Sequence, residues 1–227
     1  MYLALILTTI KERLTSIIRL IMFLSILVVG TTSHFLIGTD YGSATDAIGF
    51  SLVLGAGIIG QDISSGVLQL LFVRPIKRTN YLLSKWIAIS TLSFAVCFFQ
   101  MIVFIGKLAI FHDDISSKAV ADGLVERFVL CFTTSATLVL FSSLSSGMAD
   151  VVIFSLSFVI IGGTSLLAKS YDLKVVLQTL GHLEFFLSPK ITFDSSLVSI
   201  LGCLSNLSLS LLLASWAINR REISYAD

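Results

Sequence analysis

Apolar residues follow one another in long runs along this chain, and polar residues are collected into the segments between the runs. A run of about 20 apolar residues is long enough for an α-helix to cross the hydrocarbon core of a bilayer. The pattern therefore predicts an all-α integral membrane protein with a single domain, residues 1–227. The six predicted transmembrane helices cover residues 18–38, 45–60, 84–107, 127–147, 150–168 and 195–218. The run at 45–60 is short for a span, so it requires tilt or burial against neighbouring helices.

Before the first span, residues 2–15 show a helical pattern with one apolar face. A charged cluster follows at residues 11–13, after the apolar positions instead of before them. We expect an N-terminal interfacial helix that lies in the membrane surface. A cleaved signal peptide is the alternative, but it would carry its charges first and would be followed promptly by small residues. The apolar face consists of Leu3, Ile6, Leu7, Ile10 and Leu14.

The longest polar and basic interruption, residues 60–86, organises the chain because it cannot be read as a simple turn. It holds four basic residues against the single acid Asp62. A helix should begin near the cap-type residues 62–65 and end at Pro75, because the residue before a proline is pushed out of the helical region. Apolar positions at 67–68 and 70–72 then predict a short amphipathic helix, residues 62–72, at the membrane surface. A solvated loop that adds some leucines to the core is the alternative.

Two further connections differ in kind. Residues 142–150, SSLSSGMAD, predict a tight turn between the fourth and fifth spans, whereas residues 107–127 are expected to form a loop. Residues 169–194 carry many apolar positions before Pro189. They predict one or two short helices that lie in or dip into the membrane, a re-entrant-like connection whose non-helical backbone must be buried or hydrated.

Composition agrees with the pattern of apolar runs. Hydrophobic residues make up 56% of the chain and charged residues 13%, compared with about 25% charged in soluble proteins. A net charge of +1 gives no reason to expect a nucleic-acid partner. Cys97, Cys131 and Cys203 fall inside apolar runs at unrelated spacings, so they are expected to be packing residues that form neither a metal site nor a disulfide.

Basic residues are divided unequally between the two sides that six spans would create. If both ends of the chain and residues 60–86 share one side, that side holds nine Lys and Arg residues and the other holds six. The side richer in Lys and Arg faces the cytoplasm. We therefore expect a multi-pass protein of the cell membrane with both termini in the cytoplasm. The nine residues are Lys11, Arg13, Arg19, Arg74, Lys77, Arg78, Lys85, Arg220 and Arg221.

Two motifs resemble nucleotide-binding signatures but lack their context. Residues 55–60 read GAGIIG, yet a dinucleotide site needs a soluble strand before the motif and an acid about twenty residues after it. Close packing of small residues in lipid explains these positions more simply. Residues 163–170, GTSLLAKS, carry Ala168 where a phosphate-binding loop needs its second glycine. We expect no nucleotide site in this chain.

Ionisable residues inside a span would be the usual mark of a proton or ion pathway. Within the predicted spans His34 is the one ionisable group at depth, while Asp62 and Asp150 fall at span ends. An ion-coupled carrier is therefore disfavoured.

Residues 58–86, IIGQDISSGVLQLLFVRPIKRTNYLLSKW, resemble the segment after the second span in type-2 permeases of ATP-binding-cassette transporters. In that family an acid precedes a glycine and a Leu-Leu pair, followed by Pro, a basic turn and a Tyr-Leu-x-x-Lys entry to the third span. Gln61 departs from the pattern, because many relatives carry a second acid there. The matching positions are Asp62, Gly66, Leu70, Leu71, Pro75, Arg78, Tyr81, Leu82 and Lys85.

The resemblance implies that residues 62–72 form a coupling helix seated in a separately encoded ATPase subunit, with the N-terminal helix as a second contact. The ATPase would bind ATP and Mg, and this chain would contain no catalytic residue, cofactor or metal of its own. Such permeases work in pairs and move a substrate by alternating access, here as an exporter, between two copies or two similar chains. The residues expected to contact the ATPase are Gln61, Asp62, Ser65, Gly66, Leu70, Arg74 and Arg78.

Two other function classes stay open at this point. One is a non-transporting membrane scaffold or accessory anchor subunit, since no residue is demonstrably on a pathway. The other is an intramembrane enzyme, although no serine–histidine or paired-acid pattern recurs at helical spacing on facing spans. The sequence does not identify the substrate.

Overall fold

The computed structural model describes the helical parts of the chain and leaves several connections out. It covers residues 2–17, 20–21, 24–25, 27–28, 45–68, 77–111, 117–170, 179, 181, 189, 191, 195 and 197–221. Across these residues the regular structure is helical and contains no strand, so the all-α prediction is confirmed. The first predicted span is described at a few positions only, and most of the re-entrant-like connection lies outside the described residues.

The observed helices coincide with most of the predicted spans. By length and composition, four helical segments can cross a membrane, namely residues 46–64, 78–106, 117–144 and 197–220, as in a multi-pass membrane protein. Ala149–Ile161 is a shorter apolar stretch within α8. The helices are α1 (Tyr2–Thr15), α3 (Thr45–Gly55), α4 (Gly60–Ser64), α6 (Arg78–Phe111), α7 (Ser117–Leu144), α8 (Ala149–Ser170) and α10 (Leu197–Arg221).

The loop predicted at residues 107–127 is mostly helical instead. Helix α6 continues to Phe111 and α7 begins at Ser117. The charged residues Lys118, Asp122 and Glu126 recur every four positions on α7. This spacing places them on one helical face, which allows a helix to continue into a polar environment. The tight turn predicted between the fourth and fifth spans is confirmed at residues 145–148.

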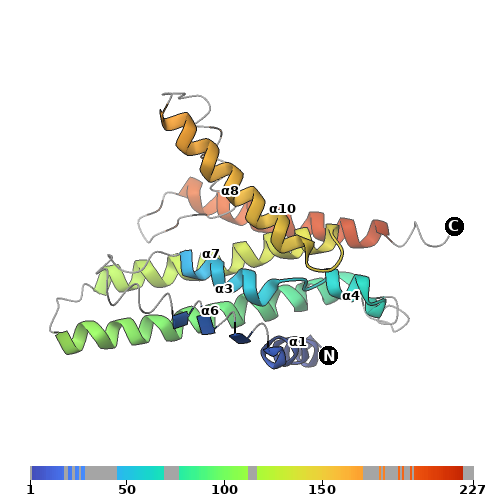
Figure 1. The fold of residues 1–227 in the computed structure, drawn as a ribbon, viewed down its shortest axis with the longest axis horizontal. Coiled ribbons are helices and arrows are strands. Elements are labelled where there is room, and N and C mark those ends of the chain that lie inside the picture. The colour runs from blue at the N-terminus through green and yellow to red at the C-terminus, as the bar shows by residue number, and fades with distance from the viewer. Residues whose placement is uncertain are drawn as a thin grey trace.

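Helix α7 is the central element of the bundle. It packs against α3, α6, α8 and α10, and these helices run alongside one another except for α8, which diverges from the bundle (Figure 1). Helix α1 is seen end-on in Figure 1, so it lies across the bundle, where it packs against α6. The last turns of α4 and α10, the start of α6 and the α7–α8 turn lie at the same end as α1.

Two apolar clusters fill the bundle. The first lies at the end near α1 and combines Ile59, Tyr81 and Ile218 with residues of α7. The second lies further along and includes Cys97 and Cys131, whose sulfur atoms are 3.7 Å apart. All three cysteines are buried and free, as expected of packing residues.

Candidate functional site

The second predicted span is broken near its end. Helix α3 ends at Gly55 and α4 begins at Gly60, and residues 56–59 form a turn between them. Gly57 adopts a φ of 63°, a left-handed conformation that costs other residues about 1–2 kcal/mol. A break inside a span leaves backbone amides and carbonyls without helical partners, and in hydrocarbon each must be satisfied within the protein.

Side chains from α7 and α8 satisfy the amides of the break. The Gly57 amide donates to a carboxylate oxygen of Asp150 at 2.8 Å. The amides of Ile59 and Gly60 both donate to the hydroxyl oxygen of Ser142, at 3.0 and 2.9 Å. Asp150 is fully buried and also accepts a hydrogen bond from the amide of Val151. Two neighbouring helices thus cap the start of α4.

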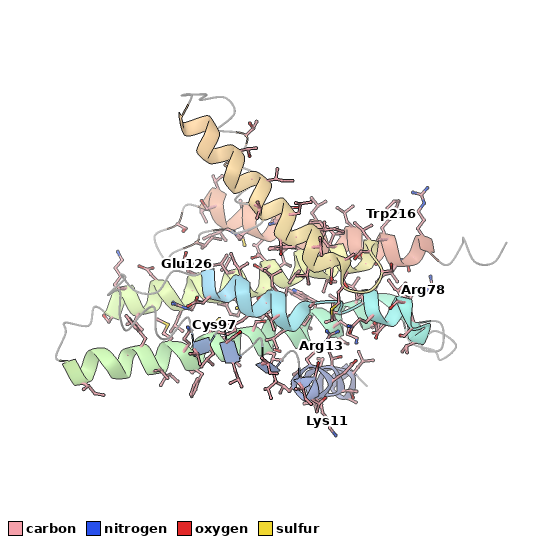
Figure 2. All side chains as sticks on the ribbon, in the orientation of Figure 1. Lys11, Arg13, Arg78, Cys97, Glu126 and Trp216 are labelled. Carbon is pink, nitrogen blue, oxygen red and sulfur yellow. The ribbon has the colours of Figure 1, made fainter. Side chains whose placement is uncertain are left out.

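The carbonyls on the other side of the break are capped from α1. The Arg13 guanidinium donates to the carbonyl of Ala56 at 2.6 Å and to that of Gly57 at 3.4 Å. Arg13 is 2% exposed and is among the largest fully buried side chains of the described residues. Figure 2 shows it on the side of α1 that faces the bundle, with Lys11 on the opposite side. The two charges match the helix dipoles, because the cation faces the end of α3 and the anion faces the start of α4.

Two glycines bring α4 against the α7–α8 turn. The Gly147 amide donates to the Gly60 carbonyl at 2.8 Å, and a Cβ atom on Gly60 would clash with the Gly147 backbone. A Cβ atom on Gly55 would lie 3.0 Å from the side chain of Leu138. The interpretation of the GAGIIG glycines as packing residues is therefore confirmed at Gly55 and Gly60. Gly57 instead provides the left-handed backbone conformation of the break.

Asp62 joins α4 to α6. Its carboxylate pairs with the ammonium of Lys85 at 3.0 Å and accepts a hydrogen bond from the Tyr81 hydroxyl. The Lys85 ammonium also lies over the Tyr81 ring, 5.6 Å from its centroid. The side chains of Lys85 and Asp62 are 6% and 13% exposed. Asp62 therefore neither caps a following helix nor stands free at a polar edge, because its carboxylate is used within the chain.

The prediction of one helix over residues 62–72 is wrong at its start. Asp62 lies in the last turn of α4, which ends at Ser64, and Ser65 is the cap residue. Gly66 follows with a φ of 71°, as glycines do just after a helix end. A separate helical segment begins at Val67, and residues 69–76 lie outside the described residues.

The other residues predicted to contact an ATPase lie around this helix end. Ser65 is exposed, whereas Gln61, Gly66 and Arg78 are half-buried. The Gln61 carbonyl accepts hydrogen bonds from the hydroxyls of both Ser64 and Ser65. Leu70 and Arg74 lie outside the described residues. The structure thus brings Gln61, Asp62, Ser65 and Gly66 onto one short segment.

Sequence reasoning missed the residues that cap the break. The sequence pattern puts Arg13 in the charged cluster of the interfacial helix, Ser142 in a turn and Asp150 at a span end. The structure buries Arg13, Lys85, Arg127 and Asp150 within its described part, although none lies in the middle of an apolar run. The usable signal was Gly57 and Gly60 inside a span, since glycine in a membrane helix marks a possible break.

The break and the Asp62 pair form one connected node, defined as Arg13, the backbone of residues 56–60, Ser142, Gly147, Asp150, Asp62, Tyr81 and Lys85. It links α1, α4, α6, α7 and α8 at one end of the bundle. Such an arrangement can transmit displacement between helices. Comparison with protein-family models, with curated proteins and with solved structures gives no match for this chain.

Proposed function

We propose that this chain is the membrane-spanning subunit of an ATP-binding-cassette transporter, with residues 61–78 as the contact for a separate ATPase subunit. The observation that carries the proposal is the pairing of Asp62 with Lys85 and Tyr81. It ties together the two helices that flank the connecting segment, α4 before it and α6 after it. A force on that segment therefore acts on two helices at once.

The node extends this connection to the rest of the bundle. Displacement of α4 would transmit force through hydrogen bonds to three helices: to α7 through Ser142, to α8 through Asp150 and to α1 through Arg13. Two-state transmission of this kind requires rigid elements in contact, because a flexible loop would absorb the movement. In the proposed transporter, ATP and Mg bind to the partner subunit, and the substrate moves between two permease chains by alternating access.

The proposal includes a topology of six spans with both termini in the cytoplasm. In support, α1, the end of α4, the start of α6, the α7–α8 turn and the end of α10 lie at one end of the bundle (Figure 1). This is the end that the basic-residue count assigns to the cytoplasm. A non-transporting anchor subunit would use the same end to hold a partner, so the two functions differ in transport and in coupling.

The experiment is to solubilise the tagged chain mildly from its native membrane and to test the isolated complex for ATP hydrolysis. The proposal predicts an ATPase subunit in the complex, whereas the chain purified alone should hydrolyse no ATP. Charge reversal at Arg78 should release the ATPase, while charge reversal at Lys118 serves as a matched control on α7, far from residues 61–78 in sequence. If a variant still binds the ATPase but ATP hydrolysis no longer drives substrate movement, the chain acts in transport and is more than an anchor. A native complex that contains no ATPase would refute the proposal.

A further inference from the structure

We propose that Arg13 makes α1 a removable cap that holds the second span broken, and that withdrawing α1 lets residues 56–59 join α3 and α4 into one helix. The device belongs to the chain itself and does not depend on the ATPase. The hydrogen bonds on either side of the break are already helical. The Ala56 amide already bonds to the Leu52 carbonyl, and the Gln61 amide to the Gly57 carbonyl, both in α-helical register.

Few bonds separate the broken form from a continuous helix. In a continuous helix the amides of residues 57–60 would donate to the carbonyls of residues 53–56. In the structure the amide of Gly57 donates to Asp150, and those of Ile59 and Gly60 donate to Ser142. The Ile58 amide donates to Gly55, one residue short of helical register. Three side-chain hydrogen bonds and one shortened turn therefore stand in for four helical bonds.

Arg13 competes directly with the continuous form. Its guanidinium occupies the Ala56 carbonyl, which is the acceptor that the Gly60 amide would need in a continuous helix. If Arg13 leaves, that buried carbonyl loses its partner, and joining the two helices is the local way to restore one. The α7 and α8 residues that cap the amides have alternatives, because Asp150 also accepts from the Val151 amide and a serine in a helix can bond to the carbonyl four residues before it.

Helix α1 is suited to be the moving part. It lies across the bundle and packs against α6, and its outward face exposes Leu3, Leu7 and Leu14. An amphipathic helix with such a face can lie on the membrane surface, and the inner face of α1 packs against α6 and the first apolar cluster. A movement of α1 along that surface would withdraw Arg13 and separate α1 from α6, while the packing of α7 against α6 and α10 would remain.

Closing the break would move the neighbouring polar pair. Each residue that changes from a turn to a helix rotates the following segment, so α4 would turn about its axis. Asp62 would then leave its position beside Lys85 and Tyr81, and the connecting segment after Gly66 would move with it. The position of α1 would thus set the position of the segment proposed to contact the ATPase.

The test measures a distance in the purified chain without any ATPase. The buried cysteines are replaced, and spin labels are placed at the exposed positions Ser64 and Leu144, so that the distance between them reports α4 against α7. A second pair, Leu83 and Leu144, reports α6 against α7 and should not change. Arg13→Ala should move the first distance distribution to a new population and leave the second distribution as it was.

Substitutions at Gly57 test the same equilibrium without touching α1. Gly57→Ala should give the same new population as Arg13→Ala, because alanine disfavours the left-handed conformation and favours a helix. Gly57→Asn adds the same Cβ atom, which in the broken form would lie 2.9 Å from the Gln61 side chain and 3.0 Å from the Gly147 carbonyl oxygen. Asparagine tolerates the left-handed conformation better than alanine, so Gly57→Asn should give a smaller shift than Gly57→Ala. Arg13→Lys keeps the charge and should also stay closer to the wild type.

The combined variant Arg13→Ala/Gly57→Ala should show the same population as either single variant. An unchanged distribution between labels 64 and 144 in both single variants would overturn the proposal, and so would an equal change in both label pairs, which would indicate general loosening. Because the measurement contains no ATPase, its failure would leave the proposed transporter function standing, and failure of the ATPase experiment would leave this device standing.

Discussion

The pair between Asp62 and Lys85 provides the most direct measure of how firmly α4 is held to α6. Replacing Asp62 by Asn would leave the Lys85 ammonium buried without its counter-charge, a change that costs about 3–5 kcal/mol for a fully buried pair. Asp62 keeps 13% exposure, so we expect the lower end, about 3 kcal/mol. For a chain of this length, each kcal/mol lowers the melting temperature by about 2–4 °C. The expected decrease is therefore roughly 6–12 °C.

Thermal unfolding in detergent checks this value, followed by the fluorescence of Trp86 in a background that carries Trp216→Phe, because the chain has two tryptophans. Trp86 suits the purpose because its indole N–H donates to the Phe132 carbonyl at 3.0 Å, which couples its fluorescence to the packing of α6 on α7. The variant Lys85→Met and the double variant Asp62→Asn/Lys85→Met complete a double-mutant cycle. The double variant should recover most of the loss of Asp62→Asn, because no charge remains buried and unpaired. Additive losses, with no interaction energy between the two positions, would refute the pairing.

Three further predictions test glycine positions and topology. Gly60→Ala should destabilise the chain by about 1–3 kcal/mol in the same unfolding assay, through overpacking. The control is Gly106→Ala, because a Cβ atom added at Gly106 meets nothing within 4 Å. This control should be neutral or stabilising. Gly66→Asn should be tolerated, but Gly66→Pro should weaken the end of α4. Proline cannot adopt the observed φ of 71°, and it lacks the amide that donates to the Ile63 carbonyl. Hydrogen exchange of residues 60–68 would show the difference between the two variants. In intact cells, an impermeant thiol reagent should label a single cysteine at position Ser117 but not one at Thr79. Labelling at position 79 would show that the predicted topology is wrong.

The helices could be predicted from the sequence because apolar runs determine them locally. Helices α3, α6, α7, α8 and α10 all overlap predicted spans. The helix bounds were less accurate where polar residues continue a helix beyond its apolar part, as at the start of α7. The end of α4 could have been predicted, since Ser64-Ser65-Gly66 is a typical helix stop with glycine just after the cap.

The node could not be predicted in the same way. Arg13 and Ala56 are 43 positions apart, and Gly57 and Asp150 are 93 apart, so no local pattern relates them. The residue types were also uninformative, because an arginine beside a lysine and a glutamate in an amphipathic helix usually faces solvent. Only the crossing of α1 near the α3–α4 junction makes that arginine a cap.

The break also explains why charged residues are buried at this end of the bundle. A continuous helix through residues 45–64 would need no caps, whereas two half-helices present partial charges of opposite sign at the break. In a medium of low dielectric constant, those partial charges are best matched by full charges from elsewhere in the protein. Arg13 and Asp150 do this from two different helices, so withdrawal of either one leaves the broken form unbalanced. The contacts of α1 and α8 with the break are therefore electrostatic as well as steric.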